Sequence, residues 1–230
     1  MTRRGFLADE RGTTLTELMV GLATGTVVML GLTTLVMLTM HTTTRVSARV
    51  DSTQRARLSL NRIVDQLHSA CIAPKVPPIR KESTSTELRF IHATGASVSP
   101  TPTLSVVRLS GTSLMQSDYA WKEGTAPYWV FQPTPIKTTL VMDHVSPISV
   151  TKPIFSYYAS AAGAASEIGL PTPLSELDAS RTIHVGIAYM AHPRSGPGSE
   201  DATPTRIRGG ATFRLTAVSY NEAAPSMPCQ

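Results

Sequence analysis

Histidine is the first side chain to consider for chemistry, because imidazole binds metals and transfers protons near neutral pH. The six histidines of this 230-residue chain are His41, His68, His92, His144, His184 and His192. None of them forms the closely spaced ligand pair that is typical of a zinc site. The sequence also lacks a nucleophile elbow, a phosphate-binding loop and a paired-carboxylate motif. We therefore expect no metal, no cofactor and no catalytic residue, and we do not expect an enzyme.

The most informative titratable group is a carboxylate in an unusual place. Glu17 is the only formal charge between Thr13 and Met40, in a stretch that is otherwise apolar or small. A charged side chain in a membrane-spanning helix costs about 2.5–3.5 kcal/mol at the centre and less near an end. Glu17 must therefore either reach the lipid headgroups or find a positive partner.

The two cysteines are candidates for a covalent link. Cys71 comes shortly before Pro74, and Cys229 is the penultimate residue. An even pair in an exported chain favours a disulfide, which would tie the C-terminus to the end of a helix. In the chain-entropy model, a bridge that closes so long a loop stabilises the fold by about 4–5 kcal/mol. Two unrelated buried thiols are the alternative.

Three segments must position these groups. Residues 1–12 are a short charged leader without an apolar core, unlike an ordinary secretory signal. Residues 13–73 are predicted to form one helix about 90 Å long. Its first part, 13–40, is long enough to span a bilayer, and its second part, 41–73, is amphipathic. Residues 74–230 are predicted to form a β-rich head outside the membrane.

The second part of the predicted helix has two different sides. Small and apolar residues at three- and four-residue spacing predict the side that packs on the head. All but Arg57 of the residues on this side are small or apolar: Val46, Val50, Thr53, Arg57, Leu60, Ile63, Val64, Leu67 and Cys71. Arginines gather in the same region, at positions 45, 49, 55, 57 and 62. Because charge alone is a non-specific signal, solvent or lipid headgroups explain them more simply than nucleic acid does.

From Pro74 onward the hydrophobic pattern has period two, which predicts β-strands. The expected strands are Thr86–Ala93, Thr103–Gly111, Thr138–Val145, Ile154–Ser160, Thr182–Ala191 and Ala211–Tyr220. A long loop, His192–Thr205, precedes the last strand. The expected fold class is therefore α+β: a long N-terminal helix packed against an antiparallel β-sheet head.

Five aromatic residues gather in the segment Ser117–Gln132. They are Tyr119, Trp121, Tyr128, Trp129 and Phe131. Such a cluster is either a partner-binding loop, because Tyr and Trp dominate binding hot spots, or a hairpin in the core, because aromatic rings bury large areas. The core hairpin is the simpler interpretation, and we expect it here.

The N-terminal residues resemble the class III signal of type IV prepilins and pseudopilins. That signal is a short charged leader, a glycine, and a glutamate as the fifth residue after the glycine, at the start of an unbroken apolar run. Here it reads Gly12, then "TTLTELMVGLA" from Thr13, with Glu17 at the fifth place. The resemblance implies a type IV pilin-like fold, cleavage after Gly12 by a prepilin peptidase and N-methylation of Thr13. It also implies that Glu17 pairs with the Thr13 ammonium of a neighbouring subunit.

The function implied by the resemblance is that of a structural minor pilin or pseudopilin in a type IV pilus, competence pilus or type II secretion pseudopilus. The implied partners are the prepilin peptidase/N-methyltransferase, other pilin or pseudopilin subunits, the inner-membrane assembly platform and membrane lipid. The chain would cross the inner membrane once, N-terminus inside and head outside, before joining an extracellular filament or pseudopilus. The alternative is a single-span anchored adhesin or binding module that does not polymerise, which would need neither Gly12 nor Glu17.

Overall fold

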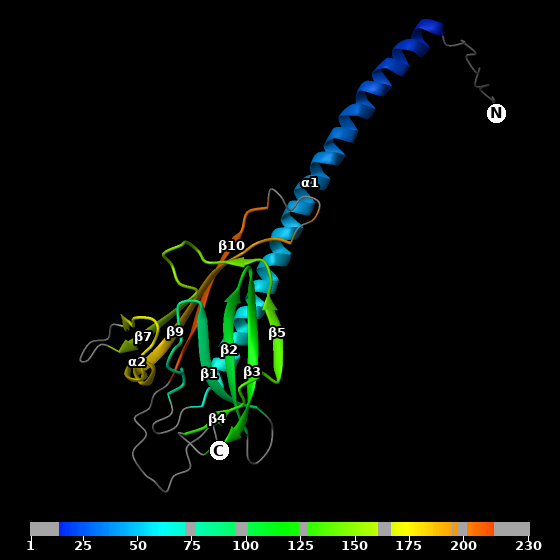
Figure 1. The fold of residues 1–230 in the computed structure, drawn as a ribbon. Coiled ribbons are helices and arrows are strands. Elements are labelled where there is room, and N and C mark those ends of the chain that lie inside the picture. The colour runs from blue at the N-terminus through cyan, green and yellow to red at the C-terminus, as the bar shows by residue number, and fades with distance from the viewer. Residues whose placement is uncertain are drawn as a thin grey trace, which may run out of the picture.

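The fold is α+β, with one long helix and a head built from two antiparallel sheets. The computed structural model describes residues 14–71, 77–94, 101–124, 128–160, 167–194, 196 and 202–213. Helix α1 (Leu15–His68) projects from the head, and only its C-terminal part lies against the sheets (Figure 1). This arrangement agrees with the fold class expected from the sequence.

Helix α1 is continuous over 54 residues, about 80 Å. Thr14 caps its N-terminus, because its side chain accepts a hydrogen bond from the Glu17 amide. Threonines within the helix turn their hydroxyls back to the preceding turn, as in the 2.8 Å bond from Thr33 Oγ1 to the Met29 carbonyl. The polar atoms of these threonines are thus satisfied inside the helix, which suits an apolar environment.

The N-terminal part of α1 is exposed and apolar. Leu22, Met29 and Leu38 expose between 62% and 72% of their surface. Within the part of the chain that the structure describes, α1 is the one helix long and apolar enough to span a membrane or to act as a signal sequence. The unpartnered apolar surface of α1 therefore needs lipid, or other protein, to cover it.

The first sheet of the described structure contains five strands. Strands β1, β2 and β3 are neighbours in that order, and both β4 and β5 pair with β3. Gly111, with a φ of 59°, makes the tight turn between β2 and β3. The strands are β1 (Glu87–Thr94), β2 (Thr101–Ser110), β3 (Ser113–Glu123), β4 (Val130–Phe131) and β5 (Lys137–Met142).

The second sheet also contains five strands within the described residues. Its order is β10, β9, β7 and β8, with β6 pairing to β9. The short helix α2 (Glu176–Arg181) leads into β9 and is capped by Ser175. The strands are β6 (Val145–Ser146), β7 (Phe155–Ser160), β8 (Glu167–Gly169), β9 (Thr182–Ala191) and β10 (Thr205–Thr212).

The core lies between the two sheets and the C-terminal half of α1, which contacts β10, β9, β5 and β1. Gly209 on β10 allows the closest approach. A Cβ added there would lie 2.7 Å from Leu60 Cδ2, so a larger residue would push the helix side chain away. The second half of α1 and both sheets consequently form one packed unit (Figure 1).

The side of α1 that packs on the head differs from the expected one. The buried helix residues are Ser52, Ala56, Ser59, Leu60, Ile63 and Leu67, whereas Val46 and Val50 are 62% and 48% exposed. The sheets lie so close that small side chains are favoured at the contact. Ser59 is tolerated there because its hydroxyl donates to the Ala56 carbonyl, 2.8 Å away. The expectation was therefore right for Leu60, Ile63, Leu67 and Cys71, and for Val64, which packs against the core half-buried. It was wrong for Val46, Val50 and Arg57, which are exposed.

The end of the helix also differs. The chain leaves the helical conformation at Ser69 rather than at Ala73. The amide of Cys71 donates to the Ile91 carbonyl at 2.8 Å, and Ala70 forms a bridge with His92. The edge of β1 therefore takes up the backbone groups that would have continued the helix.

Most of the expected strands occur, with one clear shift. Strand β9 has the expected bounds, and β1, β2, β5 and β7 agree with expectation to within three residues at each end. The last strand begins at Thr205 instead of Ala211, and residues 214–220 lie outside the described residues. Strand β3 was not expected, although it is the longest strand described.

Candidate helix-packing site

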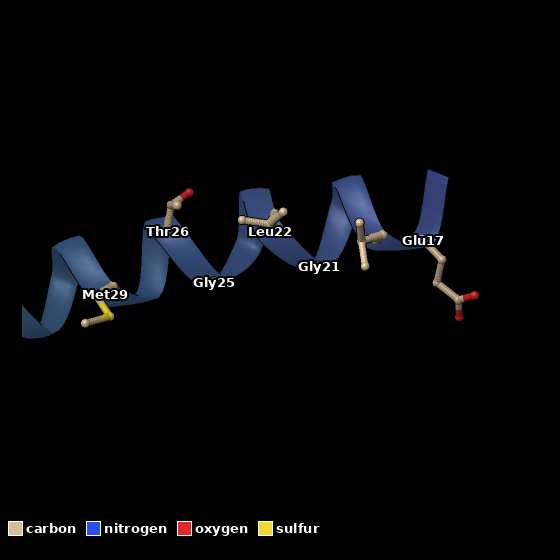
Figure 2. A pocket seen from close by; sticks show the side chains of 7 residues that line it. Glu17, Gly21, Leu22, Gly25, Thr26 and Met29 are labelled. Carbon is tan, nitrogen blue, oxygen red and sulfur yellow. The ribbon is translucent and has the colours of Figure 1, made fainter. Parts of the chain in front are cut away.

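A shallow groove runs along one side of α1 near its N-terminus, and Glu17 lies at one end of it (Figure 2). Glu17, Gly21 and Gly25 follow one another at four-residue spacing, so they share one side of the helix. Leu18, Leu22, Thr26 and Met29 line the rest of the groove. The surface thus combines a carboxylate, two glycines and apolar walls.

The two glycines leave the helix backbone open. A Cβ added at Gly21 or Gly25 would meet no atom within 4 Å, apart from the helix's own adjacent backbone. In membranes, small residues at this spacing let two helices approach closely, which maximises van der Waals contact between them. The groove is therefore shaped to receive a second helix.

The Glu17 carboxylate has no partner in the described part of the chain. Its backbone amide is capped by Thr14, at 3.4 Å to Oγ1, but its side-chain oxygens make no hydrogen bond or ion pair with a described residue. A carboxylate in an apolar environment needs a positive partner or water. An ammonium or guanidinium group on the incoming helix would supply one.

The glycine at the centre of the groove, Gly25, faces away from the side of α1 that packs on the head. Gly25 and Ile63 are 38 residues apart in the same helix, and Ile63 is completely buried against the head. At 3.6 residues per turn these 38 residues make about ten and a half turns, so Gly25 faces away from the head, whereas Glu17 lies about a quarter turn from the side that packs on the head. A second helix can therefore occupy the groove without meeting the head.

The other predicted site residues fall into two groups. Gly12, Thr13 and Cys229 lie outside the described residues. Cys71 is completely buried, and no free cysteine occurs in the part of the chain that the structure describes. The Cys71–Cys229 bridge therefore stays a prediction.

A His–Ser–Asp chain in the first sheet is not arranged for catalysis. Ser105 Oγ donates to Asp118 Oδ1 at 2.6 Å and lies 2.9 Å from His92 Nε2. In a catalytic triad the imidazole lies between the hydroxyl and the carboxylate. Here the hydroxyl lies in the middle, and Ser105 is completely buried. These residues therefore form a structural network in the interior of the sheet.

Among the described residues, no group of three or more His, Cys, Asp or Glu side chains is placed to hold a metal ion.

The shifted pKa values belong to groups that hold the fold together. Burial raises the pKa of the Tyr189 phenol to about 12, although the hydrogen bond with Ser59 acts in the opposite direction. Neither the search for metal ligands nor the shifted pKa of Tyr189 adds a second candidate site.

The aromatic cluster of Ser117–Gln132 lies on the surface, so the core interpretation was wrong. Tyr128 is 77% exposed and Trp121 is 42% exposed, while Tyr119, Trp129 and Phe131 are half-buried. The buried side chains of β3 are Leu114 and Gln116, so the strand turns its aromatic residues to the other face of the sheet. Alternation along β3 would have revealed this had the strand been recognised.

Comparison of the chain with protein families, with curated proteins and with solved structures finds no match.

The glycine face of α1, formed by Gly21 and Gly25 beside Glu17, was not predicted from the sequence, although the sequence pattern that indicates it is present. The four-residue spacing of Glu17, Gly21 and Gly25 places all three on one side of any helix.

Proposed function

We propose that the chain is a structural subunit of a helical filament, of the minor pilin or pseudopilin type. The observation that carries this proposal is the Glu17–Gly21–Gly25 face, a lone carboxylate and two open glycines on the part of α1 that extends beyond the head. Helices of neighbouring subunits pack through this face, while each head stays outside the helix bundle. The filament is a type IV pilus, a competence pilus or a type II secretion pseudopilus.

In this proposal the chain enters the inner membrane through residues 13–40, with its head on the extracytoplasmic side. A prepilin peptidase cleaves after Gly12 and methylates Thr13, and the chain itself catalyses nothing. The new Thr13 ammonium of one subunit then pairs with the Glu17 carboxylate of another. The pair offsets the cost of a lone charge among apolar helices.

The partners of this process are the peptidase, other pilin or pseudopilin subunits, the inner-membrane assembly platform and membrane lipid. A plain membrane anchor would need the lipid, but not the peptidase, the other subunits or the assembly platform. Neither the exposed carboxylate of Glu17 nor the open backbone at Gly21 would serve a helix that contacts only lipid. These two features favour a polymerising subunit over an anchored binding module.

The intact mass of the mature protein from membranes tests this function. We expect a chain that begins at Thr13, with or without one methyl group. Replacing Gly12 with a bulky residue should abolish processing, and Glu17→Ala should leave insertion intact but reduce incorporation into filaments. Thr16→Ala, one residue along the same turn, is the matched control. A mature chain that retains residues 1–12 in cells with an active prepilin peptidase would overturn the proposal.

A further inference from the structure

A groove of about 510 Å³ crosses the outer face of the first sheet, at the aromatic cluster. Leu104, Val106 and Tyr119 line it from β2 and β3, and Trp129 and Phe131 line it from the segment that contains β4. The guanidinium-bearing Arg108 also lines it, from β2. A concave site of this size that combines apolar surface with a few polar groups is typical of a binding site for a small ligand.

Strand pairing holds the groove in shape. In the sheet register Leu104 lies opposite Tyr119, and Val106 lies opposite Ser117, so these side chains share the outer face. Phe131 lies opposite Trp121, and the Gln132 amide donates to the Ala120 carbonyl at 2.9 Å, which fixes the β4 segment against β3. Most of the site is thus built on strands β1, β2 and β3, while Trp129 and Gln132 flank the two-residue strand β4.

The side chains beside this groove are more exposed than the other aromatic residues of the head. The head buries Phe90, Phe155 and Tyr157 almost completely, but leaves Trp121, Tyr128 and Val130 at least 42% exposed. Trp121 donates its indole N–H to the Gly124 carbonyl at 3.0 Å. The indole can therefore contact a ligand through its ring face but not through this N–H. A cluster of exposed rings beside a groove indicates a surface that binds something.

The groove carries one uncompensated positive charge. Arg89 lines it too, but its guanidinium is paired with Glu87 Oε1 at 2.5 Å and Glu82 Oε2 at 3.1 Å. Arg108 lies opposite Glu87 in the register, yet it forms no ion pair with any residue that the structure describes. The groove therefore favours a ligand that carries a single negative charge.

We propose that this groove binds a carboxylated sugar. The apolar face of the sugar ring stacks on Trp129 and Tyr119, and the carboxylate binds the Arg108 guanidinium. Ser117, Gln132 and the carboxylate of Glu87 also line the groove, and they pair with the sugar hydroxyls.

Other ligands fit the groove less well. An aromatic acid would satisfy Arg108 but would offer no hydroxyl groups to the polar atoms of Glu87, Ser117 and Gln132 that line the groove. A neutral sugar would leave Arg108 unpaired. A single-stranded nucleic acid would need several cations along its backbone, whereas this groove has one that is free among the described residues.

Tryptophan emission provides a direct test, because the two tryptophans of the chain are Trp121 and Trp129. The full chain is purified in detergent and titrated with sodium glucuronate at constant ionic strength. We expect a saturable change in emission with a Kd on the order of 1 mM, the value for a ligand of this size at ordinary efficiency. The change should persist in Trp121→Phe, in which Trp129 is the reporter.

Three probes separate the contributions of charge and ring. Glucose lacks the carboxylate, acetate lacks the ring, and phenylacetate replaces the sugar with an arene. We expect each of them to bind at least tenfold more weakly than glucuronate. Equal binding of glucose, or tighter binding of phenylacetate, would overturn the assignment of a carboxylated sugar.

Two arginine variants complete the experiment. Arg108→Gln should weaken glucuronate binding by about tenfold or more, with an unchanged circular dichroism spectrum. Arg208→Gln changes an exposed arginine on β10, outside the groove, and should bind as the wild type does. Equal affinities of the two variants would refute the proposal. The readout involves neither processing nor assembly, so its failure would leave the filament function untouched.

Discussion

The hydroxyl oxygen of Tyr189 lies 2.8 Å from that of Ser59, although the two residues are 130 positions apart. Tyr189 comes from β9 and Ser59 from α1, and both are buried. Tyr189 Oη also donates to the Ala56 carbonyl, at 2.7 Å. This contact is one of several that join the second sheet to the helix.

Because burial raises the pKa of Tyr189 to about 12, stability should fall at high pH. The unfolded phenol has a pKa of about 10. The neutral phenol is favoured in the native state, so its contribution is complete below pH 10 and is lost as the pH rises through the folded value. The free energy of unfolding should decrease by about 2–3 kcal/mol between pH 10 and 12.

Denaturant unfolding of the wild type and of Tyr189→Phe, between pH 8 and 12, measures this effect. At pH 8 the variant should be less stable by about 1–2 kcal/mol, because the hydrogen bond is gone. Its decline above pH 10 should be smaller than that of the wild type. Parallel decline of the two proteins would show that Tyr189 is not the titrating group.

Two adjacent glycines on β10 should differ in their tolerance of alanine. A Cβ at Gly209 would meet Leu60 Cδ2, which is the end of a flexible side chain. A Cβ at Gly210 would lie 2.5 Å from the Val185 carbonyl oxygen, which is backbone and cannot turn away. We expect Gly210→Ala to cost about 2–3 kcal/mol and Gly209→Ala about 1 kcal/mol.

Thermal unfolding of both variants checks this order, with Gly169→Ala as the control. A Cβ at Gly169 would meet no atom within 4 Å, so this change should be nearly neutral. A larger loss for Gly209→Ala than for Gly210→Ala would mean that the helix, not the sheet backbone, is the less adaptable partner.

Asp143 holds α1 to the loop that follows β9. Its two carboxylate oxygens bind Arg55 Nη1 at 2.6 Å and Arg194 Nη2 at 2.9 Å. Burial would raise the pKa of Asp143, but the hydrogen bond and charge of Arg194 and the charge of Arg55 outweigh it. The pKa of Asp143 therefore lies below its ordinary value, and the ionised form stabilises the fold.

Asp143→Asn should lower the free energy of unfolding by about 1.5–3 kcal/mol at pH 7. The wild-type advantage is present above the ordinary pKa of about 3.9 and disappears as the pH falls through the lower native value. Unfolding at pH 7 and pH 3 should therefore show a smaller difference at pH 3. Asp65→Asn, an exposed position on α1, is the control and should change little at either pH. A difference independent of pH would contradict the electrostatic explanation.

Periodicity predicted the helix and most strands because burial of one face is a local property of the sequence. It failed where small or polar residues face the interior. Gly209 and Gly210 made the start of β10 look like a loop, although they are what allows the helix to lie close to the strand. Gln116 interrupted the alternation of β3 and concealed it, yet Gln116 is buried and donates to Asp118 at 2.7 Å.

The candidate site was predicted in part for a similar reason. An isolated Glu17 in an apolar run is visible in any sequence, because its cost in lipid is large. The absence of side chains at Gly21 and Gly25 is informative only once the helix shows which side is free of the head. The exposed aromatic residues could not be assigned to a face before β3 was recognised as a strand.

The predicted disulfide has a simple test. Thiol labelling of the exported protein under non-reducing, denaturing conditions should modify neither Cys71 nor Cys229. Reduction should then expose two thiols and lower the unfolding temperature, because the bridge constrains the unfolded chain. Cys229→Ser should lower it as reduction does, and Cys71→Ser should lower it further because it also places a hydroxyl at a completely buried position. Two labelled thiols before reduction would exclude the bridge.

The glycine face of α1 should control helix association in the membrane. Gly25→Leu fills the groove beside Glu17, so a neighbouring helix cannot approach as closely. Leucine is apolar and a better helix former than glycine, so insertion should not suffer. We expect association to weaken by about tenfold, or 1.4 kcal/mol. Energy transfer between labelled copies in vesicles, as the lipid-to-protein ratio is varied, measures this change.

Gly31→Leu is the matched control, because it makes the same substitution in the same apolar segment. Gly31 lies about one and two-thirds turns beyond Gly25 and is not part of the groove. Hydrophobicity, helix propensity and length change equally in both variants, so any difference between them reports the position of the glycine on the helix. Association should therefore be lost in Gly25→Leu and retained in Gly31→Leu. If both variants associate like the wild type, the helices pack through another side of α1, and the carboxylate of Glu17 must be paired from there.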